Sequence, residues 1–139
     1  MKKLKVLLFC CLLTMILCAC GKNYDGKYKL TELNGISIEK FVSNAEKNKD
    51  LFEKQGVSFE EVTKFSSMCI ELDGEKMYFL YDGERDTHNN LSYNIEDEIF
   101  TIYNIHDDGT VGIQSGGTYV DGVITLRETS ATYKFKKEE

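Results

Sequence analysis

Apolar and polar residues alternate along most of the second half of the chain, with the period of two that is typical of β-strands with one buried face. Met68 and Ile70 begin the first of these series. Further series follow at short intervals over 77–81, 91–95, 99–105, 111–113, 118–120, 123–127 and 131–135. An earlier strand is predicted over 24–33, because Tyr28 and Leu30 share a face between polar neighbours.

A helical pattern separates this first strand from the later ones. Apolar residues recur there at spacings of three, four and seven, at Ile38, Phe41, Val42, Ala45 and Phe52. This predicts a helix that starts near Ser37 and ends at Gly56. A second short helix is predicted from Ser58, because Ser58 and Glu61 have the spacing of a capping box.

The predicted fold class is mainly β, with a helical insertion at about 37–66. Asp-Gly pairs between successive strands favour tight hairpins, so the strands should form an antiparallel meander. Roughly eight strands is the number at which a sheet closes into a small barrel, and closure removes exposed edges. We therefore predict an eight-stranded antiparallel barrel with two short helices after the first strand.

The N-terminus has a different pattern. The basic segment MKKLK precedes the apolar segment VLLFCCLLTMIL, which is too short to span a bilayer but has the length found in export signals. Leu17, Cys18, Ala19 and Cys20 follow at its end. We predict a removed signal peptide over 1–19, a short tether over 20–23 and a barrel domain over 24–139.

The segment Leu17-Cys18-Ala19-Cys20 resembles the lipobox of bacterial lipoproteins. The resemblance implies cleavage between Ala19 and Cys20 and attachment of a diacylglyceryl group to the Cys20 sulfur. Two or three acyl chains, such as palmitate, would hold the protein on the extracytoplasmic face of the cell membrane. The alternative is an ordinary secretory signal cleaved after Ala19, which would leave Cys20 free.

The order of one strand, helices and an unbroken meander resembles the small lipocalin-like lipoproteins of Gram-positive bacteria. The resemblance covers about 24–136 and depends on Gly26-Lys27-Tyr28 and on the closing segment YVDGVITLRETSATYKFKK. Lipocalins carry Gly-x-Trp in the first strand and a late arginine that packs on that ring. The resemblance thus implies that Tyr28 replaces the tryptophan and that Arg127 is its cationic partner.

The net charge of the chain limits the kinds of partner that it can bind. Residues 1–19 hold three lysines and no acidic residue, so the remainder carries 14 basic and 23 acidic residues and a formal charge of −9. Such a surface repels phosphate backbones, so we predict no nucleic-acid partner. It also disfavours electrostatic docking to anionic lipid, which leaves the covalent lipid on Cys20 as the predicted membrane attachment.

Candidate catalytic and metal-binding residues are few. His88 and His106 lie in polar loops without partners at metal-ligand spacing, and Cys69 has acidic neighbours that disfavour its thiolate. The acidic runs 96–98 and 107–109 lack the spacing of an EF-hand. We therefore predict no enzyme activity, no catalytic residue, no metal site and no cofactor.

The remaining hypothesis is binding. A barrel on the outer face of the membrane would bind a small apolar molecule or an envelope protein, and some of the eight tyrosines would line its mouth. The alternative is a structural or interaction domain whose barrel is filled by its own side chains. Alternation alone leaves the ligand-binding residues unknown.

Overall fold

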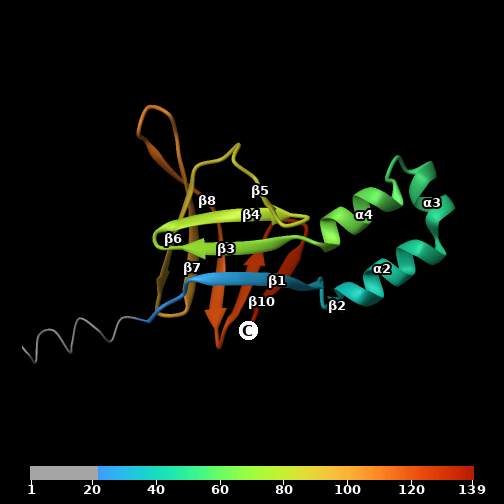
Figure 1. The fold of residues 1–139 in the computed structure, drawn as a ribbon, viewed down its shortest axis with the longest axis horizontal. Helices are drawn as coiled ribbons and strands as arrows, with labels where there is room; N and C mark the ends of the chain where they lie inside the picture. The colour runs from blue at the N-terminus through green and yellow to red at the C-terminus, as the bar shows by residue number, and fades with distance from the viewer. Residues whose placement is uncertain (1–21) are drawn as a thin grey trace, which may run out of the picture.

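The computed structural model describes residues 22–139 (Figure 1). The predicted signal peptide, its cleavage site at Ala19 and the lipidation site at Cys20 lie outside these residues and stay predictions. The strands are β1 (Gly26–Leu33), β2 (Ile36–Ser37), β3 (Cys69–Asp73), β4 (Lys76–Tyr81), β5 (Glu84–Arg85), β6 (Leu91–Glu96), β7 (Ile99–Ile105), β8 (Val111–Val120), β9 (Val123–Arg127) and β10 (Thr132–Lys137). The helices are α2 (Ile38–Lys47), α3 (Lys49–Lys54) and α4 (Phe59–Ser66).

Eight strands form a closed antiparallel ring. Each long strand pairs with the next along the chain, and β10 pairs with β1 to complete the ring in the order β1-β3-β4-β6-β7-β8-β9-β10. The strands β2 and β5, of two residues each, pair with β1 and β4 outside this ring. The predicted lipocalin-like barrel is therefore confirmed, because eight strands close without a free edge strand.

The ring is weakest between β4 and β6. Their register has only two residue pairs, Lys76 with Ser92 and Met77 with Leu91. The other half of β4 pairs with β5 instead, after a tight turn at Asp82 and Gly83, which both have positive φ. The short β5 thus pairs with the part of the β4 edge that does not pair with β6.

The core follows the predicted alternation. The side chains of Tyr28, Phe100 and Phe135 are fully buried. The remaining buried members of the cluster are Leu30, Ile38, Met68, Ile70, Leu72, Met77, Leu91, Ile102, Ile124 and Leu126. Almost all of them come from the inward faces of the ring strands, so the barrel packs around one apolar interior.

The helical insertion differs from the prediction in one respect. The first predicted helix is divided at Asn48 into α2 and α3, so three helices replace the two expected. The Asn48 side chain donates a hydrogen bond to the backbone oxygen of Asn44, which competes with continuation of the helix. The predicted starts of α2 and α4 are confirmed. Ser37 caps α2, and Ser58 and Glu61 form the full capping box of α4.

The strand β8 also corrects the prediction, because 111–113 and 118–120 belong to one strand of ten residues. A bulge opposite Ile102 and Tyr103 bends it. Beyond the bulge, Gly117 lies against β9, where a Cβ atom would come 1.7 Å from the Thr125 backbone oxygen. The glycine therefore permits a close approach inside the strand rather than separating two strands.

The β7–β8 hairpin extends beyond the rest of the barrel, as the orange part of Figure 1 shows. The strand β9 pairs only with the last part of β8, from Gly117 to Val120. The preceding segment of β8, residues 111–116, pairs with β7 alone. Val111 and Ile113 in this segment are 61% and 75% exposed, so the segment combines a one-sided backbone edge with exposed apolar side chains.

Candidate functional site

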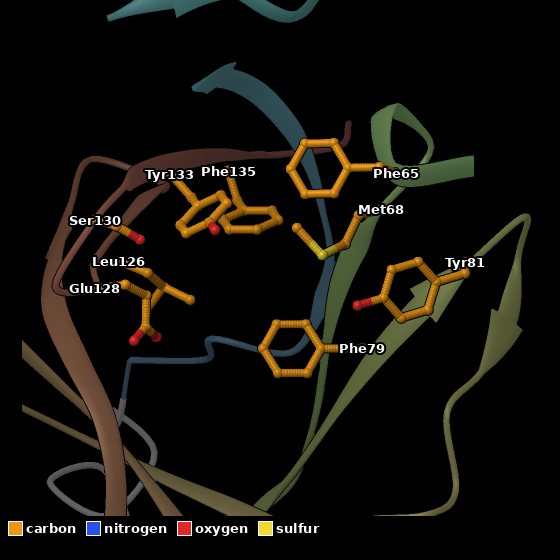
Figure 2. A pocket seen from close by; sticks show the side chains of 9 residues that line it. All are labelled: Phe65, Met68, Phe79, Tyr81, Leu126, Glu128, Ser130, Tyr133 and Phe135. Carbon is orange, nitrogen blue, oxygen red and sulfur yellow. The ribbon is translucent and has the colours of Figure 1, made fainter. Parts of the chain in front are cut away.

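A pocket of about 420 Å³ opens at the end of the barrel next to α4, which we call the pocket end (Figure 2). Four elements or their flanks contribute to it, and its lining residues are Phe65, Met68, Phe79, Tyr81, Leu126, Glu128, Ser130, Tyr133 and Phe135. Its volume falls within the roughly 300–1,000 Å³ that is typical of small-molecule sites.

The pocket has three levels. Met68, Leu126 and Phe135 are buried and form an apolar floor that belongs to the barrel core. Half-buried aromatic rings surround the space above it, from Phe65, Phe79, Tyr81 and Tyr133. The exposed side chains of Glu128 and Ser130 complete the rim on the β9 side.

Different parts of the fold position the aromatic walls. Phe79 and Tyr81 alternate with outward residues on β4, so both face the interior. Phe65 comes from the last turn of α4, and its ring lies 6.2 Å from that of Tyr133 between centroids. The insertion after β1 thus supplies a wall that the strands alone would lack.

The polar groups of the pocket differ in charge. Ser115 Oγ donates a hydrogen bond of 2.7 Å to Glu128 Oε1, which orients that carboxylate at the rim. Burial raises the pKa of Tyr81 above its ordinary value, and Asp86 and Tyr133 add to the shift, so the Tyr81 hydroxyl is neutral at pH 7. The rim therefore has one anionic group and the interior has neutral donors.

The opposite end of the barrel is filled, and we call it the tyrosine end. Tyr24 and Tyr28 both pack edge-on against Tyr119, with centroid distances of 4.9 and 6.2 Å. The Tyr28 hydroxyl donates a hydrogen bond of 2.6 Å to the Tyr24 backbone oxygen.

Tyr28 has a different cationic partner from the one expected. Lys137 Nζ lies 5.7 Å from the Tyr28 ring centroid, in the position predicted for Arg127. Tyr28 pairs with Lys137 at the end of β10, whereas Arg127 pairs with Thr132 at its start. These positions are about 16 Å apart along an extended strand, so register excludes Arg127.

The eight tyrosines divide by position. Tyr81 and Tyr133 line the pocket, as predicted for a subset at the barrel mouth. Tyr24, Tyr28, Tyr93 and Tyr119 lie in or near the tyrosine end, where the Tyr93 hydroxyl donates to the Gly74 backbone oxygen. Tyr78 lies beneath the guanidinium of Arg85, at 4.0 Å from the ring centroid.

The other candidate residues do not converge on a site. His88 and His106 line the same surface hollow beside asparagines, and the His88 ring contacts Asp86 at 2.7 Å. Cys69 lies on the outer side of β3, and burial is the main cause that raises its thiol pKa, with Glu138 adding to it. Within residues 22–139, no group of three or more His, Cys, Asp or Glu side chains is arranged to hold a metal ion.

Comparisons with known proteins add no relative. No protein-family model, no curated protein and no solved structure matches the chain. None of the helices in the described part is long and apolar enough to span a membrane.

Proposed function

We propose that the chain is a lipid-anchored, non-enzymatic binding protein on the extracytoplasmic face of a bacterial membrane. The barrel would take a small apolar molecule into the pocket end. The observation that carries this proposal is the pocket of Figure 2, whose apolar floor and aromatic walls remain open beside α4 while the tyrosine end is filled. The barrel is thus a fold that suits a binding domain.

The anchoring part of the proposal is supported by the sequence around Cys20. Metabolic labelling with an alkyne-bearing fatty acid in a bacterial host tests it. We expect Cys20→Ser to abolish the label. The matched variants Cys18→Ser and Cys69→Ser should keep the label, because neither cysteine would be the acyl acceptor. A label that survives in Cys20→Ser would contradict lipidation at this residue.

The binding part is tested with a photoactivatable probe, a dodecyl alcohol that carries a diazirine. The full-length protein in phosphatidylcholine nanodiscs is irradiated, and the labelled residues are mapped by mass spectrometry. We expect labelling of peptides that contain Phe65, Tyr81 or Tyr133. Absence of label from these peptides would contradict a ligand pocket here.

A blocking variant makes this test specific. Ser130 lies on the pocket rim and is exposed, so Ser130→Trp should fill the entrance without disturbing the core. Thr129 is also exposed but is not a lining residue, so Thr129→Trp is the matched control. Labelling should fall about tenfold in Ser130→Trp and stay unchanged in Thr129→Trp. Equal labelling in both would place the probe outside the pocket.

A second candidate function, binding of an envelope protein, is favoured by the β7–β8 hairpin. Residues 111–116 pair on one side only, and this segment has neither charge nor proline to block further pairing. Val111 and Ile113 add an exposed apolar surface. An extended strand of another protein would fit this edge by backbone hydrogen bonding.

In-cell cross-linking tests this candidate. A photo-reactive amino acid at Gln114 should give one discrete product with an envelope protein, whereas the same group at Glu96 on β6 should not. Ile113→Lys should remove the product, because it places a charge on the edge. A product that contains only this chain would indicate self-association and contradict the candidate.

A further inference from the structure

We infer that the pocket end selects apolar molecules with a positively charged end. This inference rests on the proposed function, since it names the ligand class of the same pocket. It starts from the arrangement of the lining residues, in which an apolar floor, an aromatic wall and a charged rim follow one another outward. Such an order accommodates an amphiphile whose apolar part enters first.

The charged group at the pocket rim determines which sign of ligand charge the pocket favours. Glu128 is the one acidic residue among the lining residues, and within the described part of the chain no lysine, arginine or histidine lines the pocket. No ion pair of the described residues involves Glu128. Ser115 donates a hydrogen bond of 2.7 Å to one of its oxygens, which orients the carboxylate without neutralising its charge.

The aromatic walls of the pocket also favour a positively charged ligand. Aromatic faces attract cations through the ring quadrupole, with energies from about 0.5 kcal/mol at exposed sites to about 2 kcal/mol where water is excluded. Five aromatic residues line this pocket, among them Phe79 and Tyr133 on opposite parts of its wall. An anionic end would meet both the Glu128 carboxylate and the negative ring faces.

The surroundings also act against anions. The chain after residue 19 carries a formal charge of −9, and Asp86 lies close enough to Tyr81 to raise the pKa of its hydroxyl. A net negative charge on a protein raises the local concentration of cations and lowers that of anions. The pocket is therefore complementary to a hydrophobic cation, such as an alkylammonium compound, and not to a fatty acid.

A matched probe series tests the inference. Three dodecyl diazirine probes carry a trimethylammonium, a hydroxyl or a sulfate group and are each titrated, on a scale of free aqueous concentration, against the full-length protein in phosphatidylcholine nanodiscs. We expect half-maximal pocket labelling by the cation at a concentration about tenfold below that of the sulfate. The hydroxyl probe should fall between them.

Two acidic variants separate a local effect from net charge. Glu128→Gln should weaken labelling by the cationic probe about threefold to fivefold and leave the hydroxyl probe unchanged. Glu96→Gln removes the same charge from β6, outside the pocket, and should change neither. Equal labelling by the cation and the sulfate, or no effect of Glu128→Gln, would overturn the inference while the proposed function stands. Failure of the hydroxyl probe would overturn the proposed function itself.

Discussion

Single residues determine whether each end of the barrel is filled or open. Tyr28 fills the tyrosine end, and its fully buried ring has a hydroxyl that must be hydrogen-bonded there. Burial is the main cause that raises the pKa of Tyr28 above its ordinary value, and Tyr119 adds to it. The folded state therefore holds the Tyr28 proton more tightly than the unfolded chain does.

This difference predicts a loss of stability in alkali. Above about pH 10 the unfolded chain releases the tyrosine proton while the folded chain keeps it, so the free energy of unfolding falls as pH rises. Denaturant unfolding between pH 9 and pH 11.5 measures the slope. Tyr28→Phe should be less stable at neutral pH, because the bond to the Tyr24 oxygen is lost, but its stability should fall less steeply above pH 10.

The control for this prediction is Tyr103→Phe, on the outer face of β7. That variant should retain the alkaline slope of the wild type. A slope in Tyr28→Phe equal to that of the wild type would show that Tyr28 does not carry the effect.

The positions of single residues were only partly predictable from the sequence. Alternation correctly placed Tyr28 and Leu30 in the interior, because the strand period of two fixes the face of each residue. It could not place Tyr81 at the pocket and Tyr119 at the other end, since both occupy ring strands and only the register sets their height along the barrel. The exchange of Arg127 for Lys137 as partner of Tyr28 has the same cause.

At the scale of elements, β8 depends on the absence of a side chain. A Cβ at Gly117 would lie 1.7 Å from the Thr125 oxygen, and backbone atoms cannot move aside as a flexible side chain can. Gly117→Ala should therefore force β8 and β9 apart and lower the free energy of unfolding by about 2–4 kcal/mol. Thermal and denaturant unfolding measure this loss.

A second glycine in the same strand is the matched control. At Gly112 an added Cβ would contact only His106 Nε2, at 3.5 Å, which is an ordinary van der Waals distance. Gly112→Ala should change the free energy of unfolding by less than about 0.5 kcal/mol. Equal losses for the two variants would show that the close approach to β9 is unimportant.

The elements were predicted best where local chemistry defines them. The capping box of Ser58 and Glu61 and the turn at Asp121 and Gly122 both occur as expected, because each depends on residues close in sequence. The division of the first helix at Asn48 and the unity of β8 were missed. The first depends on the hydrogen bond from the Asn48 side chain to the backbone, and the second on pairing of β8 with both β7 and β9 across a bulge.

At the scale of the whole molecule, the fold depends on the pairing of β10 with β1. This contact joins residues about 100 positions apart and completes the ring. A chain truncated after Ala131 loses β10 and the fully buried Phe135, and it leaves β1 and β9 as free edges. We expect it to lack cooperative unfolding by circular dichroism, whereas removal of Glu139 alone should preserve the transition. Cooperative unfolding of the truncated chain would show that closure is dispensable.

The direction of β1 has a consequence for the whole molecule. The strand begins at Gly26 in the tyrosine end and runs to Leu33, which lies beside Tyr133 at the pocket end, roughly 20 Å farther along the tilted barrel. A chain held to a bilayer through Cys20 would therefore stand with its filled end toward the lipid headgroups and its mouth toward the water. Guest molecules would enter and leave from the aqueous side rather than by sideways movement out of the leaflet.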